Sequence, residues 1–341
     1  MPTQRSLLPL ILFCLAAPAQ ADVFASSGSP LTIPTPGIVT GGLEILEPLP
    51  LSDVDVLVAL DHPRAQDLGL TLIAPGGKRV ELLSPGSLSG GVRLLCFDDE
   101  AGGVSPQGPV ASLAPIAPLS RLDGKLASGR WKLEVVDTNQ PAAGQLLNFA
   151  LAVNGQVRLG SQVGVVIGDF DTVDLPLSVP DDFPVGDLEL GFWIDHTFPG
   201  DLTLRLTSPD GVDSLLFQEG TLSLATVRSV VLDDDSDDSI QALAAGGSGR
   251  FRTLSGTALD ALTGAPAAGT WELTVNDDAF GDIGVLEWWW LHFVDTGIET
   301  TLPSPTAWAD PDLTPALPRL DPCDVLRLEG SDPAFDTAIA V

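Results

Sequence analysis

The sequence predicts an all-β fold built from two tandem jelly-roll-like antiparallel β-sandwich domains. The phrase at 61–77 is almost repeated at 195–211, and the block at 122–137 recurs at 262–277. Within each copy, apolar residues alternate with a period of two, and glycine and proline separate the runs. Short half-buried strands produce this pattern, so a whole domain has been duplicated.

The N-terminal 21 residues have the pattern of a cleavable export signal. Arg5 precedes an apolar run at 7–17, which is too short for a stable membrane-spanning helix. The Ala-Gln-Ala sequence ending at Ala21 fits a cleavage site, and the mature chain then begins at Asp22. We expect a secreted or periplasmic protein.

The remaining chain divides into four parts. We expect an N-terminal linker at 22–37, a first sandwich at 38–157 and a second sandwich at 165–297. The segment 298–341 is rich in proline and lacks periodicity, which is typical of an extended tail.

The final strand of the second copy is unusually aromatic. Its period of two places Trp289, Leu291 and Phe293 in the core. Their neighbours Trp288, Trp290 and His292 then face outward and form a candidate contact surface. This surface would stack on a carbohydrate, dock a protein or pack against the other copy, and the sequence leaves all three interpretations open.

The charge of the chain excludes some partners. There are 46 Asp and Glu residues against 16 Lys and Arg, giving a formal net charge of −30. Such a surface repels phosphate backbones, so we expect no nucleic-acid partner. It also repels anionic membranes, and no mature segment is long and apolar enough to be inserted in one. Calcium is the natural cation for carboxylate oxygens.

Acidic clusters recur at equivalent places in the two copies. If several loops contribute oxygen ligands, each copy holds a calcium ion, although the spacing is not that of an EF-hand. In the alternative interpretation the loops are solvated and an aspartate caps a turn. The candidate calcium ligands are Asp67, Asp98, Asp99, Glu100 and Asp137 in the first copy, and Asp201, Asp233, Asp234, Asp235 and Asp277 in the second.

Other repeated residues favour structural roles. His62 and His196 have two interpretations. They are metal ligands or acid-base groups, or they are strand-end residues that hold the following turn. Their occurrence in both copies favours the structural role. Trp131 and Trp271 recur in the second repeated block, and we expect structural roles for them.

The cysteines and histidines give no sign of catalysis. After signal cleavage two cysteines remain, Cys96 and Cys323, which either form one disulfide or stay as thiols. A serine protease needs a nucleophile, a histidine base and an orienting carboxylate, and no recognisable triad motif is present. We expect a non-enzymatic chain.

The ordered set of motifs resembles the P domain, or P/Homo B domain, of kexin- and furin-like subtilisin-family proprotein convertases. The set begins with Asp-His and an Asp-Leu turn, continues with an acidic loop and Gly-x-Trp-x-Leu-x-Val-x-Asp, and ends in an aromatic strand. The resemblance spans about 38–157 and 165–297, without a catalytic domain.

The resemblance implies a jelly-roll that stabilises an attached or neighbouring protease. We therefore expect an exported, non-catalytic protein that binds or stabilises an extracellular partner, with a subtilisin-like serine endopeptidase as the leading class and calcium as a candidate cofactor. The alternatives are a carbohydrate-binding or adhesion module and a serine-type endopeptidase role by family membership alone.

Overall fold

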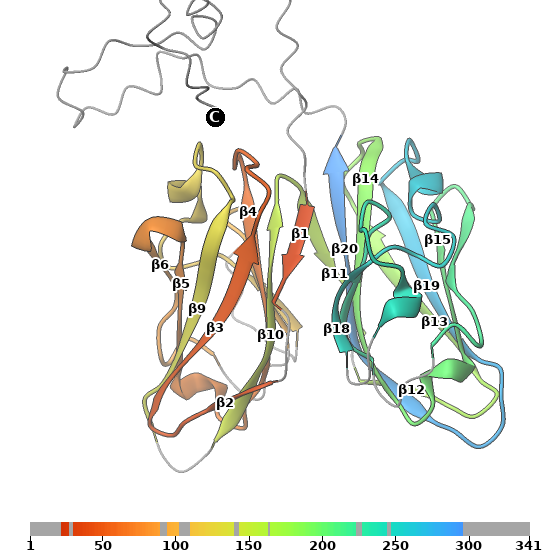
Figure 1. Cartoon of the computed structure of the whole chain (residues 1–341), viewed down its shortest axis with the longest axis horizontal. Coiled ribbons are helices and arrows are strands. Elements are labelled where there is room, and N and C mark those ends of the chain that lie inside the picture. The colour runs from red at the N-terminus through yellow and green to blue at the C-terminus, as the bar shows by residue number, and fades with distance from the viewer. Residues whose placement is uncertain are drawn as a thin grey trace, which may run out of the picture. The chain divides into compact units, whose positions relative to one another are not determined.

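The structure is a computed structural model that describes residues 22–26, 30–88, 94–101, 110–139, 143–162, 164–222, 227–243 and 247–295 (Figure 1). These residues form strands and six short 3-10 helices, and they contain no α-helix. Within this part of the chain, no helix has the length and apolar character needed to cross a membrane. The predicted signal peptide and the predicted tail lie outside the described residues.

The first sandwich consists of two sheets. One sheet runs β1 (Asp22–Ala25), β10 (Gly144–Val153), β4 (Val54–Asp61), β7 (Leu94–Phe97) and β8 (Val110–Leu113), with β2 (Leu31–Ile33) also pairing with β10. The other sheet runs β3 (Gly37–Ile45), β9 (Gly129–Asp137), β5 (Leu68–Ile73) and β6 (Arg79–Leu83).

The second sandwich repeats this order strand for strand. Its first sheet runs β11 (Gln156–Leu159), β20 (Gly284–Asp295), β14 (Val185–His196), β17 (Val227–Leu232) and β18 (Gly247–Phe251), with β12 (Val165–Ile167) pairing with β20. Its second sheet runs β13 (Thr172–Val179), β19 (Gly269–Asp277), β15 (Leu202–Thr207) and β16 (Asp213–Phe217). The predicted all-β fold of two tandem sandwiches is confirmed.

Three details differ from the predicted organisation. The predicted linker at 22–37 contains β1 and β2, which pair with β10. The first sandwich was predicted to extend to 157, but β11 begins at Gln156 and pairs with β20 of the second sandwich. The sandwiches are also not wholly antiparallel, because β7 pairs with β8, and β17 with β18, in parallel. Local alternation reveals none of these pairings, because it identifies a strand but neither its partner nor its direction.

Each sandwich has its own apolar core. Trp131 and Trp271 lie at equivalent places and are almost completely buried. Their indole Nε1 groups donate to the carbonyls of Ala127 and Ala267 at 2.7 and 2.9 Å. A buried indole needs such an acceptor, so these residues fix the chain that precedes β9 and β19. The predicted core residues of β20, Trp289, Leu291 and Phe293, are each 0% exposed.

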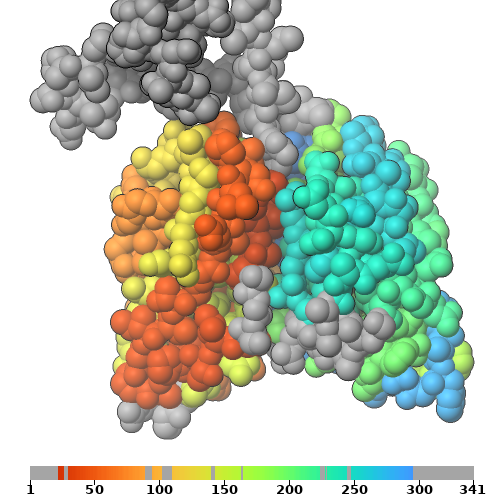
Figure 2. Space-filling model, in the orientation of Figure 1, coloured from red at the N-terminus to blue at the C-terminus, as the bar shows by residue number. Residues whose placement is uncertain are grey.

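A third apolar cluster joins the two sandwiches, and we call it the seam. Small residues such as Ala150 and Ala152 of β10 face the large side chains Trp288 and Trp290 of β20. In Figure 2 the first copy, red to yellow, meets the second, green to blue. The buried members of the seam are Val23, Leu57, Ala59, Leu94, Cys96, Ala150, Ala152, Val157, Trp193, Val231, Trp288 and Trp290.

Candidate functional site

The acidic loops use their carboxylates to organise turns. In the first copy, Asp99 accepts from the backbone N–H groups of Leu119 and Ser120, both at 2.8 Å, at the start of the 3-10 helix η3 (Leu119–Leu122). Asp98 accepts from the backbone N–H of Glu100 at 2.6 Å. These are the capping contacts expected where a short acidic side chain holds a turn.

The second copy has the same arrangement. Asp234 accepts from the backbone N–H groups of Thr253 and Leu259 at 3.0 and 2.7 Å. Asp233 accepts from the backbone N–H of Asp235 at 2.8 Å. These predicted ligands therefore cap turns, and each ionised carboxylate keeps lone-pair sites for a further ligand.

The two histidines close an equivalent corner in each copy. His62 Nδ1 accepts from the backbone N–H of Arg64 at 3.1 Å, and His196 Nδ1 accepts from that of Phe198 at 3.2 Å. Their Nε2 atoms lie 3.5 and 3.4 Å from carboxylate oxygens of Asp137 and Asp277. A serine protease would require a serine hydroxyl beside this nitrogen, where the structure places a carboxylate.

The candidate calcium ligands of each copy fall into two separate groups. In the first copy, Asp67 and Asp137 lie near the His62 corner, which follows the end of β4. The Asp98 loop instead follows β7, whose last residue pairs with Val56 near the start of β4. A strand of eight residues spans roughly 25 Å, so one ion cannot bind both groups. Asp201 and Asp277 are separated from the Asp233 loop of the second copy in the same way.

The expectation that one ion gathers ligands from all these loops is therefore corrected, because strand register places the loops at opposite ends of each sandwich. Calcium binding within either group stays a prediction.

The predicted outward surface of β20 is covered by the first sandwich. Trp288 and Trp290 are each 3% exposed, and His292 is 0% exposed. The ring of Trp288 meets that of Trp193 edge to face, with centroids 5.9 Å apart. The residues face out of their own sandwich as predicted, but they are buried in the seam. Stacking on a carbohydrate requires accessible rings, so the structure supports the interpretation of packing against the other copy.

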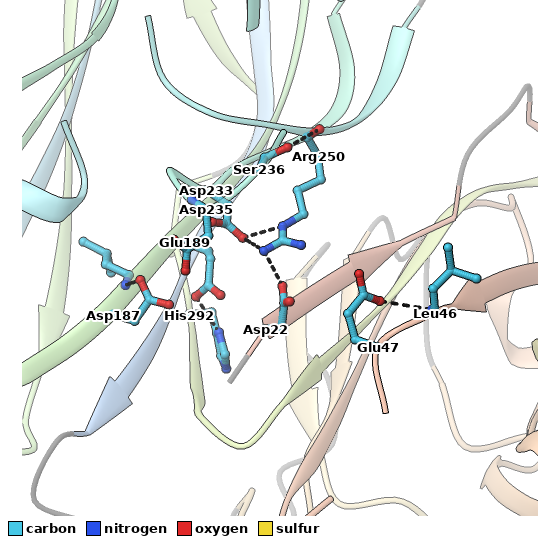
Figure 3. A network of polar contacts seen from close by, with 11 residues as sticks. Asp22, Leu46, Glu47, Asp187, Glu189, Asp233, Asp235, Ser236, Arg250 and His292 are labelled. Carbon is cyan, nitrogen blue, oxygen red and sulfur yellow. Dashed lines mark hydrogen bonds and ion pairs between the residues drawn. The ribbon is translucent and has the colours of Figure 1, made fainter. Parts of the chain in front are cut away.

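A buried ionic cluster lies beside the seam (Figure 3). It joins Asp22 of β1 in the first copy to Glu189 of β14, Asp233 after β17 and Arg250 of β18 in the second. Arg250 Nη2 lies 2.7 Å from Asp22 Oδ1 and also pairs with Asp233. His292 Nδ1 lies 2.7 Å from Glu189 Oε2.

Burial controls the protonation of this cluster. Desolvation raises the pKa of Asp22 to about 8, against a smaller opposing effect of the Arg250 charge. It raises the pKa of Glu189 well above its usual range and also raises that of Asp233. The same effect lowers the pKa of His292 to about 4, so this imidazole is neutral at neutral pH. At neutral pH the buried carboxylates of this cluster are therefore stabilised either by protonation or by a further positive charge.

Sequence reasoning missed the central members of this cluster. Asp22 belonged to the expected linker, and its strand pairing joins residues far apart in the chain. Glu189 sits in an alternating strand, where a carboxylate normally marks the solvent-facing side. The available signal was its alignment with Asp55, a second carboxylate within an apolar strand.

Asp55 shows the equivalent place in the first copy. It is 3% exposed and accepts a hydrogen bond from the backbone N–H of Val157. Burial raises its pKa well above the usual range. The adjacent strand carries Cys96, a buried free thiol whose pKa is raised by burial, whereas Cys323 lies outside the described residues.

Two β-sandwiches with sequence-equivalent corners and a buried common seam define a duplicated two-domain β protein. The family described as the proprotein convertase P-domain matches residues 51–153 and 185–293. The chain belongs to this family and carries two P domains. P domains are non-catalytic modules that accompany serine proteases.

The relatives are bacterial serine proteases. The chain is 36% identical over 101 residues to the microbial serine proteinase of Aeromonas salmonicida, covering 29% of this chain and 15% of that protein. It is 38% identical over 94 residues to the extracellular serine protease of Aeromonas sobria, covering 27% and 14%. The match therefore spans about one seventh of each relative.

Solved structures of the Aeromonas sobria protease are also similar to this chain. The crystal structure of the protease has 24% identity and a TM-score of 0.26, covering 39% of this chain and 26% of the other. Its complex with a chaperone has 24% identity and a TM-score of 0.27 over the same shares.

Proposed function

We propose that this chain is an exported, non-catalytic tandem P-domain protein that binds and stabilises a subtilisin-like serine protease or another member of the same extracellular proteolytic system. The observation that carries the proposal is the P-domain match in both sandwiches. In the relatives, the matched region is a minor part of a serine protease. A module of this kind acts through the protein surface that it contacts.

The contacts of the histidines support a non-catalytic role. His62 and His196 are held between a backbone N–H and a buried aspartate, and His292 contacts Glu189. A general base must reach a nucleophile or a substrate proton. These three imidazoles instead serve the corners of the sandwiches and the buried cluster.

The buried seam supports a single two-domain binding unit. It contains Trp193, Trp288 and Trp290, and a hydrogen bond of 2.6 Å from Asn148 Nδ2 to Ser229 Oγ also joins the copies. Large apolar interfaces restrict relative domain motion. A partner would then meet a surface of fixed geometry, which lowers the entropy lost on binding.

The experiment is affinity capture from the native secreted fraction with the tagged full chain as bait. An unrelated exported β-sandwich protein of similar acidity is the control bait, and excess untagged chain is the competitor. We expect a subtilisin-family protease to be enriched by the chain alone and to be displaced by the competitor. Running the capture in calcium and in chelator tests whether this association depends on calcium.

The identity of the captured protein decides the outcome. Equal recovery of proteases by both baits contradicts the proposal. Specific recovery of polysaccharide with no protease also contradicts it. Purified chain that hydrolyses peptides, and loses this activity on treatment with a serine-directed inhibitor, contradicts the non-catalytic role.

A further inference from the structure

The buried cluster beside the seam has the geometry of a cation site. Asp22, Glu189 and Asp233 each offer one carboxylate oxygen, and these oxygens lie within 4.8 Å of one another. Calcium binds oxygen ligands at about 2.3–2.6 Å, so two ligands of one ion lie at most about 5 Å apart. The three carboxylates come from two different sandwiches, and strand packing holds them together.

Glu189 supplies a second indication of a ligand. Its side chain is completely buried, and Oε2 is occupied by His292 Nδ1 at 2.7 Å. Among the described residues, Oε1 is buried and has no hydrogen-bond partner. Figure 3 shows the Glu189 carboxylate reaching toward Asp22. A buried acceptor without a partner is costly, so this oxygen is suited to a ligand.

The charges of the cluster also lack balance. Three carboxylates face one guanidinium, that of Arg250, which pairs with Asp22 and Asp233. An uncompensated buried charge strongly destabilises a protein. A divalent cation would offset the negative charge that Arg250 and the α-ammonium of a mature chain beginning at Asp22 leave unbalanced.

We propose that Asp22, Glu189 and Asp233 bind one divalent cation through their carboxylate oxygens. Oxygen-only ligands of this kind favour hard cations such as calcium. The ion joins β1 of the first sandwich to β14 and the end of β17 in the second, and so stabilises the seam. This inference does not depend on which partner the protein binds.

The first copy provides a matched comparison. Asp55 aligns with Glu189 and is equally enclosed, but its carboxylate accepts a hydrogen bond from the Val157 backbone. The position equivalent to Asp22 is Gln156, which carries no charge. We therefore expect Asp55→Asn to leave cation binding unchanged, although it also removes a buried carboxylate.

The test uses the full exported chain, freed of metal with chelator, and terbium as a luminescent calcium substitute. Tryptophans at the seam make excitation transfer to a bound ion measurable. We expect wild type and Asp55→Asn to show one calcium-displaceable terbium site that Glu189→Gln lacks. Calorimetric titration with calcium should show one fewer bound ion for Glu189→Gln, which leaves the acidic-loop carboxylates intact.

Thermal unfolding keeps the test informative if binding is weak. Calcium at about 100 times its dissociation constant should raise the unfolding midpoint of wild type by roughly 5 °C or more. The midpoint of Glu189→Gln should not respond, and in chelator it should equal or exceed that of wild type because the amide needs no counter-charge. If Glu189→Gln does not fold, Asp22→Asn tests the same site from the first sandwich.

Equal calcium stoichiometry in wild type and Glu189→Gln, or no calcium-displaceable terbium in wild type, would overturn the proposal. Loss of binding in both single variants, Asp55→Asn and Glu189→Gln, would also overturn the proposal, because binding would then not be specific to this cluster. Partner capture by Glu189→Gln remains measurable in either case, so failure of the cation site and failure of the proposed function are distinguishable.

Discussion

Trp290 lies over Gly191 at the seam, and this contact predicts a specific energetic coupling. A methyl group added at position 191 would lie 2.0 Å from Cε2 of the Trp290 ring. Gly191→Ala therefore forces the indole to move within a packed interface, which typically costs about 1–3 kcal/mol. Trp290→Ala removes the buried ring and should cost about 3–5 kcal/mol.

The double variant separates this contact from general effects of the substitutions. Once the indole is absent, the three atoms nearest to the added methyl group are gone. Alanine at 191 should then stabilise the strand by about 0.5–1 kcal/mol, because alanine loses less backbone entropy than glycine. The two changes should therefore show a coupling energy of about 1.5–4 kcal/mol.

Urea unfolding of wild type, the two single variants and the double variant measures this coupling. Circular dichroism of each variant checks that the folded state is retained. If Gly191→Ala is neutral or stabilising in the wild-type background, Trp290 does not lie over Gly191 and the description of the seam is wrong. Strictly additive effects would lead to the same conclusion.

Three further predictions follow from separate features. Trp131→Phe and Trp271→Phe should each lower the free energy of unfolding in urea by about 1–3 kcal/mol, because each substitution leaves a buried carbonyl unpaired. A cost in one copy alone would contradict the equivalence of the two tryptophans. Burial raises the pKa of Asp53 from 3.8 to about 6, so its folded state binds the proton more tightly. The resulting stabilisation is full below pH 3.8 and is lost as the pH rises to about 6. Across this window the free energy of unfolding of wild type should fall by about 3 kcal/mol relative to that of Asp53→Asn. Parallel pH profiles of the two proteins would refute this. The intact mass of the exported protein should place its first residue at Asp22, and a retained leader would contradict signal cleavage.

The sequence was sufficient to predict the duplicated fold, because its signals are local. Alternation along β4, β9 and β20 identifies strands, and the two repeated sequence blocks identify the duplication. The same alternation correctly placed Trp289, Leu291 and Phe293 in the core. Alternation depends only on neighbours within one strand, and the repeat depends only on comparing two stretches of sequence.

The candidate site was less predictable, because it depends on contacts between distant parts of the chain. The period-two alternation indicates which face of the strand Trp288 and Trp290 occupy. It does not reveal that the first sandwich covers that face. Repeated aspartates identified the acidic loops, but only strand register shows that the loops lie at opposite ends of each sandwich. Asp22 joins Glu189 only after β1 has paired with β10.

Partner capture combined with an active-site probe for serine hydrolases tests the proposed protease partnership. The native secreted fraction is labelled with a fluorophosphonate probe and then captured on the tagged chain, beside the control bait. We expect a labelled subtilisin-family protease that is retained by the tagged chain and not by the control bait, while the chain itself remains unlabelled. A labelled chain would contradict the non-catalytic role, and the absence of a specifically retained serine protease would contradict the proposed partner.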